Sequence, residues 1–156
     1  MKNYDISEIL QFAIKIEENG EEFYRVLAKS TEDKKQSELF EYLADEEVNH
    51  KNVFTSLLSK LKAYNTDEFP EEYFAYLKAY ANSMIFDLKD VEGETGKIRD
   101  IKAAVDYAIK KELDSILLYQ ELKDAIPQEQ HSILNKIIQQ ERNHFIKLSS
   151  IKKILV

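Results

Sequence analysis

The sequence contains no cysteine, and its 156 residues include only three glycines and two prolines. Without cysteine the chain cannot form a disulfide, a thiolate metal site or a cysteine nucleophile. Because glycine and proline most often mark turns, their scarcity leaves few places for the tight connections that strands need. Long runs rich in alanine, leucine, glutamate and lysine instead predict an all-α protein with long helices.

The chain also lacks an excess of positive charge and any long apolar run. Its net charge of −7 argues against nucleic acid and anionic membrane surfaces as partners. No stretch approaches the roughly 18 continuous apolar residues of a membrane span. The first residues, MKNYDISEIL, lack the apolar core of a secretion signal. We therefore expect a cytoplasmic protein.

Two pairs of long helices are predicted. The first helix begins at Asp5, which stands at capping-box spacing from Glu8, and a short polar break at residues 31–33 separates it from the second. In the second pair, Pro127 marks the start of the last helix near its N1 position. We predict helices over residues 5–30, 34–63, 101–125 and from Pro127 almost to the C-terminus.

A long connection joins the two pairs. It holds Pro70, Gly93, Gly96 and the aromatic run YFAYLKAYANSMIF, which suggests a short helix within it. Two short-looped helix pairs joined by a long crossover are typical of a ferritin-like four-helix bundle. We expect one domain over residues 1–156: a first repeat at about 5–63, a crossover at about 64–100 and a second repeat at about 101–154.

The two helix pairs resemble each other in sequence. Residues 13–27, AIKIEENGEEFYRVL, align with residues 108–122, AIKKELDSILLYQEL. The second helices match at EVNH (residues 47–50) and ERNH (residues 141–144). The matches coincide at chemically unusual residues, which indicates a genuine internal repeat.

Each predicted helix carries one glutamate on its inward face. Apolar residues recur at alternating spacings of three and four, and this stripe faces the core of a bundle. A glutamate replaces a core hydrophobe in every stripe: Glu17, Glu47, Glu112 and Glu141. No lysine or arginine occupies the stripes, so the carboxylates need another source of positive charge.

Two divalent cations would neutralise these four carboxylates. His50 follows Glu47 by three residues, and His144 follows Glu141 in the same way, so each pair lies on one helix face. One glutamate from each of two helices plus Glu-x-x-His from each of two others is the ligand set of di-iron and di-manganese bundles. The alternative is a metal-free bundle in which Glu-x-x-His is a solvated coincidence.

Several neighbours of these residues are candidates for supporting roles. Tyr24 and Tyr119, each seven residues after a glutamate, are either core aromatics or hydrogen-bond donors to ligand carboxylates, and we favour the second role. Glu46 and Gln140 could orient the opposite histidines, although solvent exposure is the simpler expectation for Glu46. We expect His131 at the surface.

Three further positions are small or ambiguous. Gly20 and its repeat counterpart Ser115 are both small, and we expect a larger side chain at Gly20 to crowd the metal pair or a substrate pocket. Glu21 lies one turn from Glu17, and whether Glu21 or Ser115 joins the site stays open.

With these motifs the sequence resembles the rubrerythrin-type members of the ferritin-like di-iron carboxylate superfamily. The resemblance covers all four helices and is most specific in E-x-x-G-x-x-F-Y-x-x-L-A (residues 17–28) and L-A-x-E-E-x-x-H (residues 43–50). It implies a di-iron centre that reduces hydrogen peroxide, or O2. The ligands it implies are Glu17, Glu47, His50, Glu112, Glu141 and His144.

This chain departs from typical rubrerythrins in two ways. It has no cysteine for a rubredoxin domain, so the resemblance implies a separate electron-donor protein. Ser115 stands where a second glutamate is usual, one turn after the ligand of the third helix. Peroxide reduction therefore has two alternatives, an iron-binding ferroxidase and a metal-binding bundle without turnover. Manganese or zinc would also suit the ligands.

The aromatic run in the crossover bears on assembly. We expect it to pack across the bundle, and we also expect a homodimer, in which helix pairs could be swapped between subunits. The residues concerned are Tyr73, Phe74, Tyr76, Tyr80 and Phe86.

Overall fold

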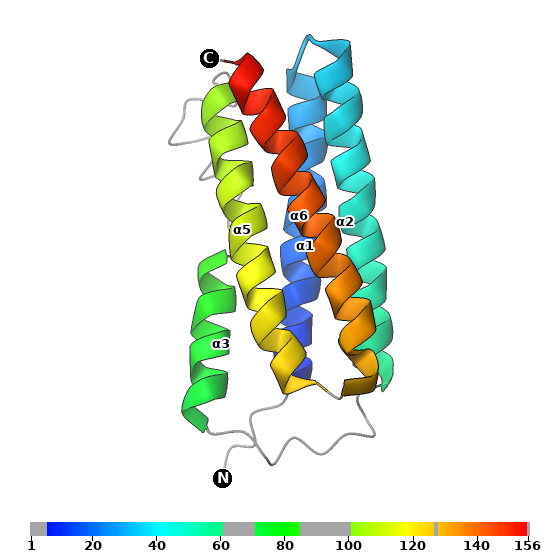
Figure 1. The fold of residues 1–156 in the computed structure, drawn as a ribbon, viewed down its shortest axis with the longest axis vertical. Helices are drawn as coiled ribbons and strands as arrows, with labels where there is room; N and C mark the ends of the chain where they lie inside the picture. The colour runs from blue at the N-terminus through cyan, green and yellow to red at the C-terminus, as the bar shows by residue number, and fades with distance from the viewer. Residues whose placement is uncertain (1–5, 61–70, 85–100, 127, 156) are drawn as a thin grey trace.

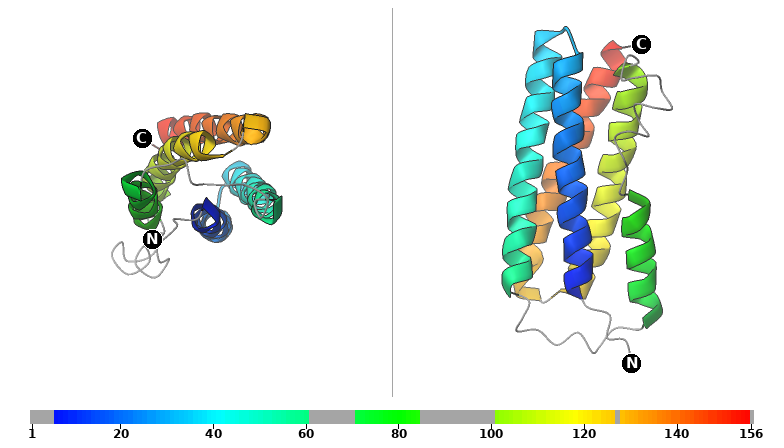
Figure 2. Two further views of the ribbon diagram at one scale, coloured as in Figure 1. Left: turned by 90° about the horizontal axis from the view of Figure 1, so that it is seen from below. Right: turned by 180° about the vertical axis from the view of Figure 1, so that it is seen from behind.

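The protein is a bundle of four long helices with one shorter helix packed on its outside (Figures 1 and 2). The computed structural model describes residues 6–60, 71–84, 101–126 and 128–155. Within these ranges the structure contains no strand. The predicted all-α, ferritin-like bundle with a short helix between its second and third long helices is confirmed. The helices are α1 (Ile6–Ser30), α2 (Lys34–Lys60), α3 (Glu71–Met84), α5 (Ile101–Ala125) and α6 (His131–Ile154).

The predicted helix boundaries agree closely except at the start of the last helix. α6 begins at His131, not near Pro127, and a short 3-10 helix, η2 (Gln128–Gln130), precedes it. Gln130 makes no side-chain cap, so the chain enters α6 through a tighter turn of the kind common at helix ends. The predictions that concern Asp5, Pro70, Phe86, Gly93, Gly96, Pro127 and residues 61–63 lie outside the described residues.

The turn between α1 and α2 is held by side chains on both of its sides. Asp33 accepts a hydrogen bond from the backbone N–H of Gln36 (2.9 Å) and so caps the first turn of α2. Ser37 donates to the carbonyl of Ala28 near the end of α1 (2.8 Å). The turn directs α2 back along α1, and it lies at the same end of the bundle as the end of α6 (Figure 1).

A polar layer divides the apolar core into two clusters. One cluster includes Leu10, Phe54 and Leu134, and the other includes Leu27 and Leu148, all of them buried. The inward glutamates lie between these clusters along each helix, because each interrupts an otherwise apolar stripe. Both ends of the bundle are therefore packed with hydrocarbon, and the middle holds charge.

α3 packs against α1 and α5 on the outside of the bundle. Tyr73 donates a hydrogen bond to the carbonyl of Glu121 (2.8 Å), and Tyr80 donates to the carbonyl of Asp114 (3.0 Å). Leu77 is fully buried beneath the helix. The described part of the aromatic run thus packs across the bundle, as expected, except for Tyr76, which is exposed.

The described helices also bear on membrane insertion. None of them combines the length and the hydropathy that a membrane-crossing helix requires.

Candidate metal centre

The four inward glutamates meet in the polar layer, one from each long helix. Their exposed fractions are 1% for Glu17, 4% for Glu47, 2% for Glu112 and 1% for Glu141, so water does not solvate them. Isolated carboxylates do not stay charged in such surroundings unless they are paired or bind a cation. The glutamates predicted to face inward therefore meet in the core. Their buried like charges must be compensated within the site.

The carboxylates and the two histidines form two overlapping groups. In each group, one potential ligand atom per residue lies within 4.8 Å of all the others. The first group contains Glu17 and His50, the second contains Glu112 and His144, and both contain Glu47 and Glu141. Glu47 and Glu141 thus belong to both groups, and each group adds one further carboxylate and one imidazole of its own.

Both histidines point their Nδ1 atoms at carboxylates. His50 Nδ1 lies 2.7 Å from Glu141 Oε1 and 3.6 Å from Glu17 Oε2. His144 Nδ1 lies 3.5 Å from Glu47 Oε1 and 3.5 Å from Glu112 Oε2. Each imidazole therefore faces carboxylates from its own repeat and from the other one.

Several polar atoms of these side chains lack hydrogen-bond partners, and this lack bears on whether cations would fit the site. Within the described chain, no hydrogen-bond partner of acceptable geometry exists for either nitrogen of His50, either nitrogen of His144, Glu112 Oε2 or Glu141 Oε1. Buried polar atoms are nearly always paired, so a cluster of exceptions requires an explanation. Divalent cations coordinated by these nitrogens and oxygens would satisfy them, and the donor set suits such cations.

The glutamate pKa values divide into two classes in the metal-free protein. Burial, reinforced by the charge of Glu47, raises the pKa of Glu17 well above its usual value. Burial and the charge of Glu141 do the same to the pKa of Glu112. Burial alone would also raise the pKa of Glu47, but the proximity of Glu17 and the histidines lowers it. Similar contacts outweigh burial at Glu141, whose pKa falls to about 2.

The histidine pKa values shift in the direction that complements these carboxylates. Burial would lower the pKa of His50, but its carboxylate neighbours, Glu141 first, raise it far above the usual value. The carboxylates around His144, Glu112 first, overcome burial in the same way and raise its pKa. Without metal, these shifts favour protons on both histidines and on Glu17 and Glu112. Metal ligands must be deprotonated, so cation binding would displace these protons.

Two tyrosines link the helix pairs at the site. Tyr24 on α1 donates a hydrogen bond to Glu112 on α5, and Tyr119 on α5 donates to Glu17 on α1. Both tyrosines are buried, so each would otherwise leave its hydroxyl without water. The predicted hydrogen bonds to carboxylates are present, and they cross between the repeats.

Glu46 and Gln140, the two residues that could orient the histidines, contact each other near the site. Glu46 is half-buried, with a side chain 15% exposed, so the expectation that it faces solvent holds only in part. Gln140 donates to Glu46 (3.2 Å), and Glu46 Oε2 lies 3.9 Å from His144 Nε2. Glu46 therefore approaches the histidine of the opposite repeat.

Three residues whose role was ambiguous lie in different surroundings. Glu21 pairs with Arg25 (3.7 Å) and belongs to neither group, whereas Ser115 is buried on the inward stripe. His131 is half-buried, with Nε2 3.0 Å from the carbonyl of Ile126, so the expectation of a surface histidine holds only in part.

Lys111 is a buried lysine beside the centre that the sequence analysis does not predict. Lys111 is 9% exposed, and its Nζ donates to the carbonyl of Ile16 (3.3 Å). Burial lowers the pKa of Lys111, although the surrounding glutamates, Glu47 first, oppose the shift. The internal repeat carried the signal, because Lys111 aligns with Ile16, a buried core position.

Gly20 is explained by what lies next to it. A Cβ atom on Gly20 would stand 3.3 Å from Glu47 Cγ and 3.3 Å from Lys111 Nζ. These separations are tighter than most Cβ contacts, so even a methyl group would press on a side chain of the site. The glycine lets α1 approach both Glu47 and the lysine.

Comparisons with known proteins agree with this geometry. The sequence matches the Rubrerythrin family over residues 8–152. The fold is similar to the crystal structure of a Thermotoga maritima protein provisionally described as a ferritin-like diiron-carboxylate protein, with a TM-score of 0.66 and 30% sequence identity. That similarity covers 96% of this chain and 95% of the other. No match is found among curated protein sequences. The chain therefore belongs to the rubrerythrin family of ferritin-like proteins.

Proposed function

We propose that the protein is a di-iron oxidoreductase that reduces hydrogen peroxide, or O2, with electrons from a separate donor protein. The observation that carries this proposal is the pair of overlapping buried groups with orphaned imidazole nitrogens. A solvated or purely structural charge cluster would not leave so many buried polar atoms without partners.

The ligand assignment follows the two groups. Glu17 and His50 would hold one iron, Glu112 and His144 would hold the other, and Glu47 and Glu141 would be shared. Two bound Fe(II) ions would supply the two electrons needed to cleave the O–O bond of one peroxide, and two protons would complete two molecules of water. The same oxygen and nitrogen donors would accept manganese or zinc, so the metal itself is part of the proposal.

The protein's own residues prepare this chemistry. The apolar clusters on both sides exclude bulk water and so strengthen the electrostatic interactions within the site. Tyr24 and Tyr119 hold the unshared carboxylates Glu112 and Glu17 in place across the helix pairs. The chain has no cysteine to carry electrons, which supports a separate donor.

Metal loading followed by peroxide titration tests the function. Anaerobically reconstituted protein should bind two Fe(II) per chain, and its visible absorption should reach an end point at one peroxide per iron pair. With a reduced donor present, turnover should depend on iron and should be abolished in Glu112→Ala. Glu18→Ala is a matched control, since Glu18 lies exposed on α1. Donor oxidation that proceeds equally without iron would refute the proposal.

Ser115 favours one second candidate. The residue is buried on the inward stripe where the resemblance implies a second glutamate, so the carboxylate to which a ligand exchange is tied is missing there. An iron-binding ferroxidase, which oxidises Fe(II) with O2, does not require that exchange. Size-exclusion chromatography separates the candidates, because a dimer favours the peroxidase and a cage of many subunits favours iron handling.

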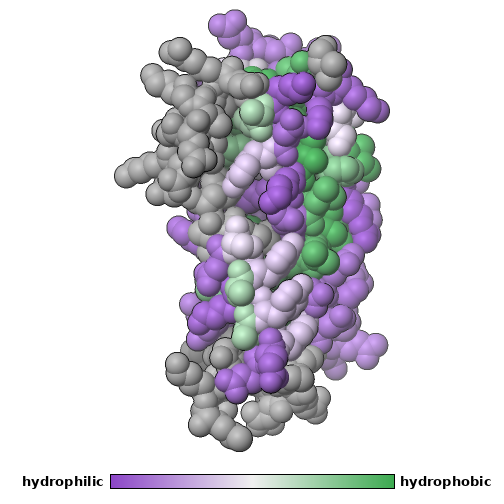
Figure 3. All heavy atoms as spheres, turned by 90° about the vertical axis from the view of Figure 1, so that its left-hand side faces the viewer, coloured by the Kyte–Doolittle hydropathy of each residue, from purple (hydrophilic) through white to green (hydrophobic). Residues whose placement is uncertain are grey.

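We also propose that two chains associate through the outer face of α5. Figure 3 shows a band of apolar side chains along this side of the bundle. Leu113 and Leu117, one turn apart on α5, are each 46% exposed, and contiguous apolar surface often marks an interface. Glutamate at both positions should convert a dimer to a monomer in sedimentation analysis. A wild-type monomer would refute the association, and crosslinking between helix pairs would test whether they are swapped.

A further inference from the structure

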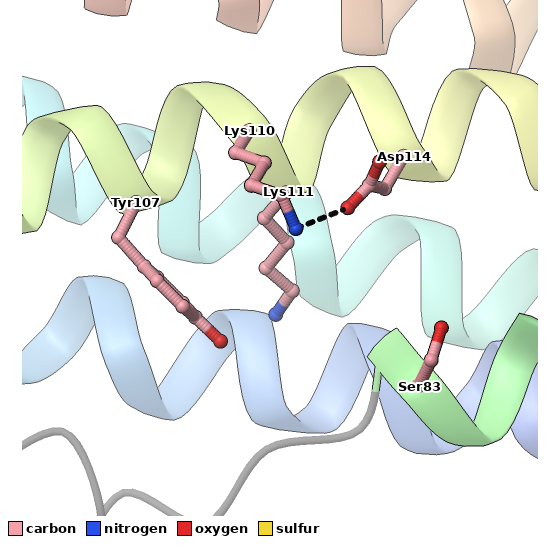
Figure 4. A pocket seen from close by; sticks show the side chains of 5 residues that line it. All are labelled: Ser83, Tyr107, Lys110, Lys111 and Asp114. Carbon is pink, nitrogen blue, oxygen red and sulfur yellow. Dashed lines mark hydrogen bonds and ion pairs between the residues drawn. The ribbon is translucent and has the colours of Figure 1, made fainter.

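A small polar pocket lies between α3 and α5, on the side of the bundle where α3 packs (Figure 4). It is lined by Ser83, Tyr107, Lys110, Lys111 and Asp114. Its volume is about 30 Å³, and a water molecule needs roughly 10–15 Å³ of such space. The pocket is therefore large enough for a solute of two or three heavy atoms.

Lys111 connects this pocket with the metal-ligand cluster. Lys111 lines the pocket, and its amine extends away from α5 toward α1, as Figure 4 shows. There Nζ donates a hydrogen bond to the carbonyl of Ile16. A Cβ atom on Gly20 would lie 3.3 Å from this Nζ and 3.3 Å from Glu47 Cγ, so Lys111 and Glu47 approach α1 at the same place. One side chain thus spans the distance between the pocket and a shared carboxylate of the proposed centre.

The two repeats differ at this position in a way that packing alone does not require. The counterpart of Lys111 in the first repeat is Ile16, which is 1% exposed and belongs to the apolar core. Burying an ammonium group is costly, whereas an isoleucine at the same position would gain from burial. A lysine appears only in the repeat whose helix borders the pocket, which suggests a function that depends on its charge.

The charge around the pocket favours anions. The protein carries a net charge of −7, yet Lys110 and Lys111 are adjacent here. Lys110 is paired with Asp114 (3.4 Å) at the rim, while the Lys111 ammonium points inward. Four glutamates surround Lys111, so its ammonium itself, and not the pocket as a whole, supplies the positive charge that attracts small anions.

We infer that this pocket admits small anions or peroxide-sized polar solutes to the proposed metal centre, and that Lys111 is the residue that selects and admits them. The inference rests on the proposed function, because it requires a metal centre behind the lysine. The long flexible stem of lysine can swing aside without any backbone movement, and its ammonium attracts an anion from the pocket toward Glu47.

Azide binding to the iron-loaded, oxidised protein tests the inference. Iron is counted first in every variant; a wild type without two irons per chain overturns the proposed function and this inference together. At equal iron content, Lys111→Met keeps the length of the side chain and removes the charge. We expect its azide Kd to rise at least tenfold.

A second variant tests the opening itself and does not disturb a buried residue. Ser83→Trp places a large side chain at the pocket from the exposed face of α3. It should slow azide association about tenfold in stopped-flow absorption and leave Kd unchanged, because a steric barrier slows entry and exit equally. Ser150→Trp is the matched control, since Ser150 is also exposed and its hydroxyl likewise donates to a helix carbonyl. Unchanged Kd in Lys111→Met and unchanged association in Ser83→Trp would overturn the inference.

Discussion

The Tyr119 hydroxyl donates a hydrogen bond to the Glu17 carboxylate, across 102 residues of sequence and between the two helix pairs. Its counterpart by the internal repeat, Tyr24, makes the reciprocal bond to Glu112. Each repeat therefore positions a carboxylate of the other, which couples the assembly of the bundle to the geometry of the centre.

Tyr119→Phe should weaken metal binding more than it weakens the fold. The variant frees one oxygen of Glu17 and leaves the apolar ring in place, so its packing against Phe54 remains. Loss of a residue that orients a ligand typically reduces metal affinity about 10–100-fold. Competition with a chromophoric chelator measures the affinity, and Tyr107→Phe on the same helix is the control. An unchanged affinity would show that the tyrosine only fills the core.

The two classes of glutamate should respond differently to amidation. The raised pKa of Glu17 favours its protonated form in the metal-free protein, so Glu17→Gln should change the free energy of unfolding by only about 1 kcal/mol or less. Glu141 is ionised beside His50, so Glu141→Gln should cost about 3–5 kcal/mol, as removal of one partner of a buried ion pair does. Urea unfolding of the metal-free proteins gives both values.

The same two variants, Glu17→Gln and Glu141→Gln, should also be compared with metal bound. Cations at a free concentration of 100 Kd stabilise the wild type by about 2.7 kcal/mol, and both variants should lose most of this gain. If Glu17→Gln kept the full metal-dependent stabilisation, Glu17 would not be a ligand.

The metal-free and metal-loaded proteins should depend on pH in opposite directions. The raised pKa values of Glu17, Glu112 and both histidines mean that the native metal-free state binds protons which the unfolded chain releases. The contribution of these groups is complete below the unfolded values of 4.5 and 6.5 and is lost as pH rises above them. Each extra proton costs about 1.4 kcal/mol of stability per pH unit.

Between pH 5 and 8 the four raised groups outnumber Lys111, whose lowered pKa acts in the opposite direction, and the lowered pKa values of Glu47 and Glu141 act below 4.5. The unfolding free energy of the metal-free protein should therefore fall over this range, while metal affinity rises because the same protons must leave. Chemical denaturation at several pH values, with and without Co(II), measures both trends. Parallel trends would contradict the assigned protonation.

Substitutions at Gly20 should separate helix propensity from crowding. Alanine gains roughly 1 kcal/mol of helix propensity over glycine, but its Cβ would press on Glu47 and on Lys111. The lysine amine can move aside, so Gly20→Ala should leave the metal-free stability within about 1 kcal/mol of the wild type. Gly20→Leu cannot be accommodated in this way and should lower metal occupancy. Full occupancy in Gly20→Leu would show that the glycine serves helix packing alone.

The sequence by itself determines the helices and the faces that converge. Periodicity within a helix is local, so the spacing of Glu47 and His50 is enough to place both side chains on one side of α2. The internal repeat extends this reasoning from one helix pair to the other. Proline and polar residues at helix ends are weaker guides, and Pro127 predicts a start for α6 that is earlier than the observed start at His131.

Only the tertiary structure decides what depends on the register between helices. The sharing of Glu47 and Glu141, the crossing of the tyrosine hydrogen bonds and the burial of Lys111 against α1 all involve contacts between different helices. Their relative heights are set by how the apolar clusters pack, and no spacing within a single helix encodes that. The sequence specifies which groups face inward, and packing specifies which of them meet.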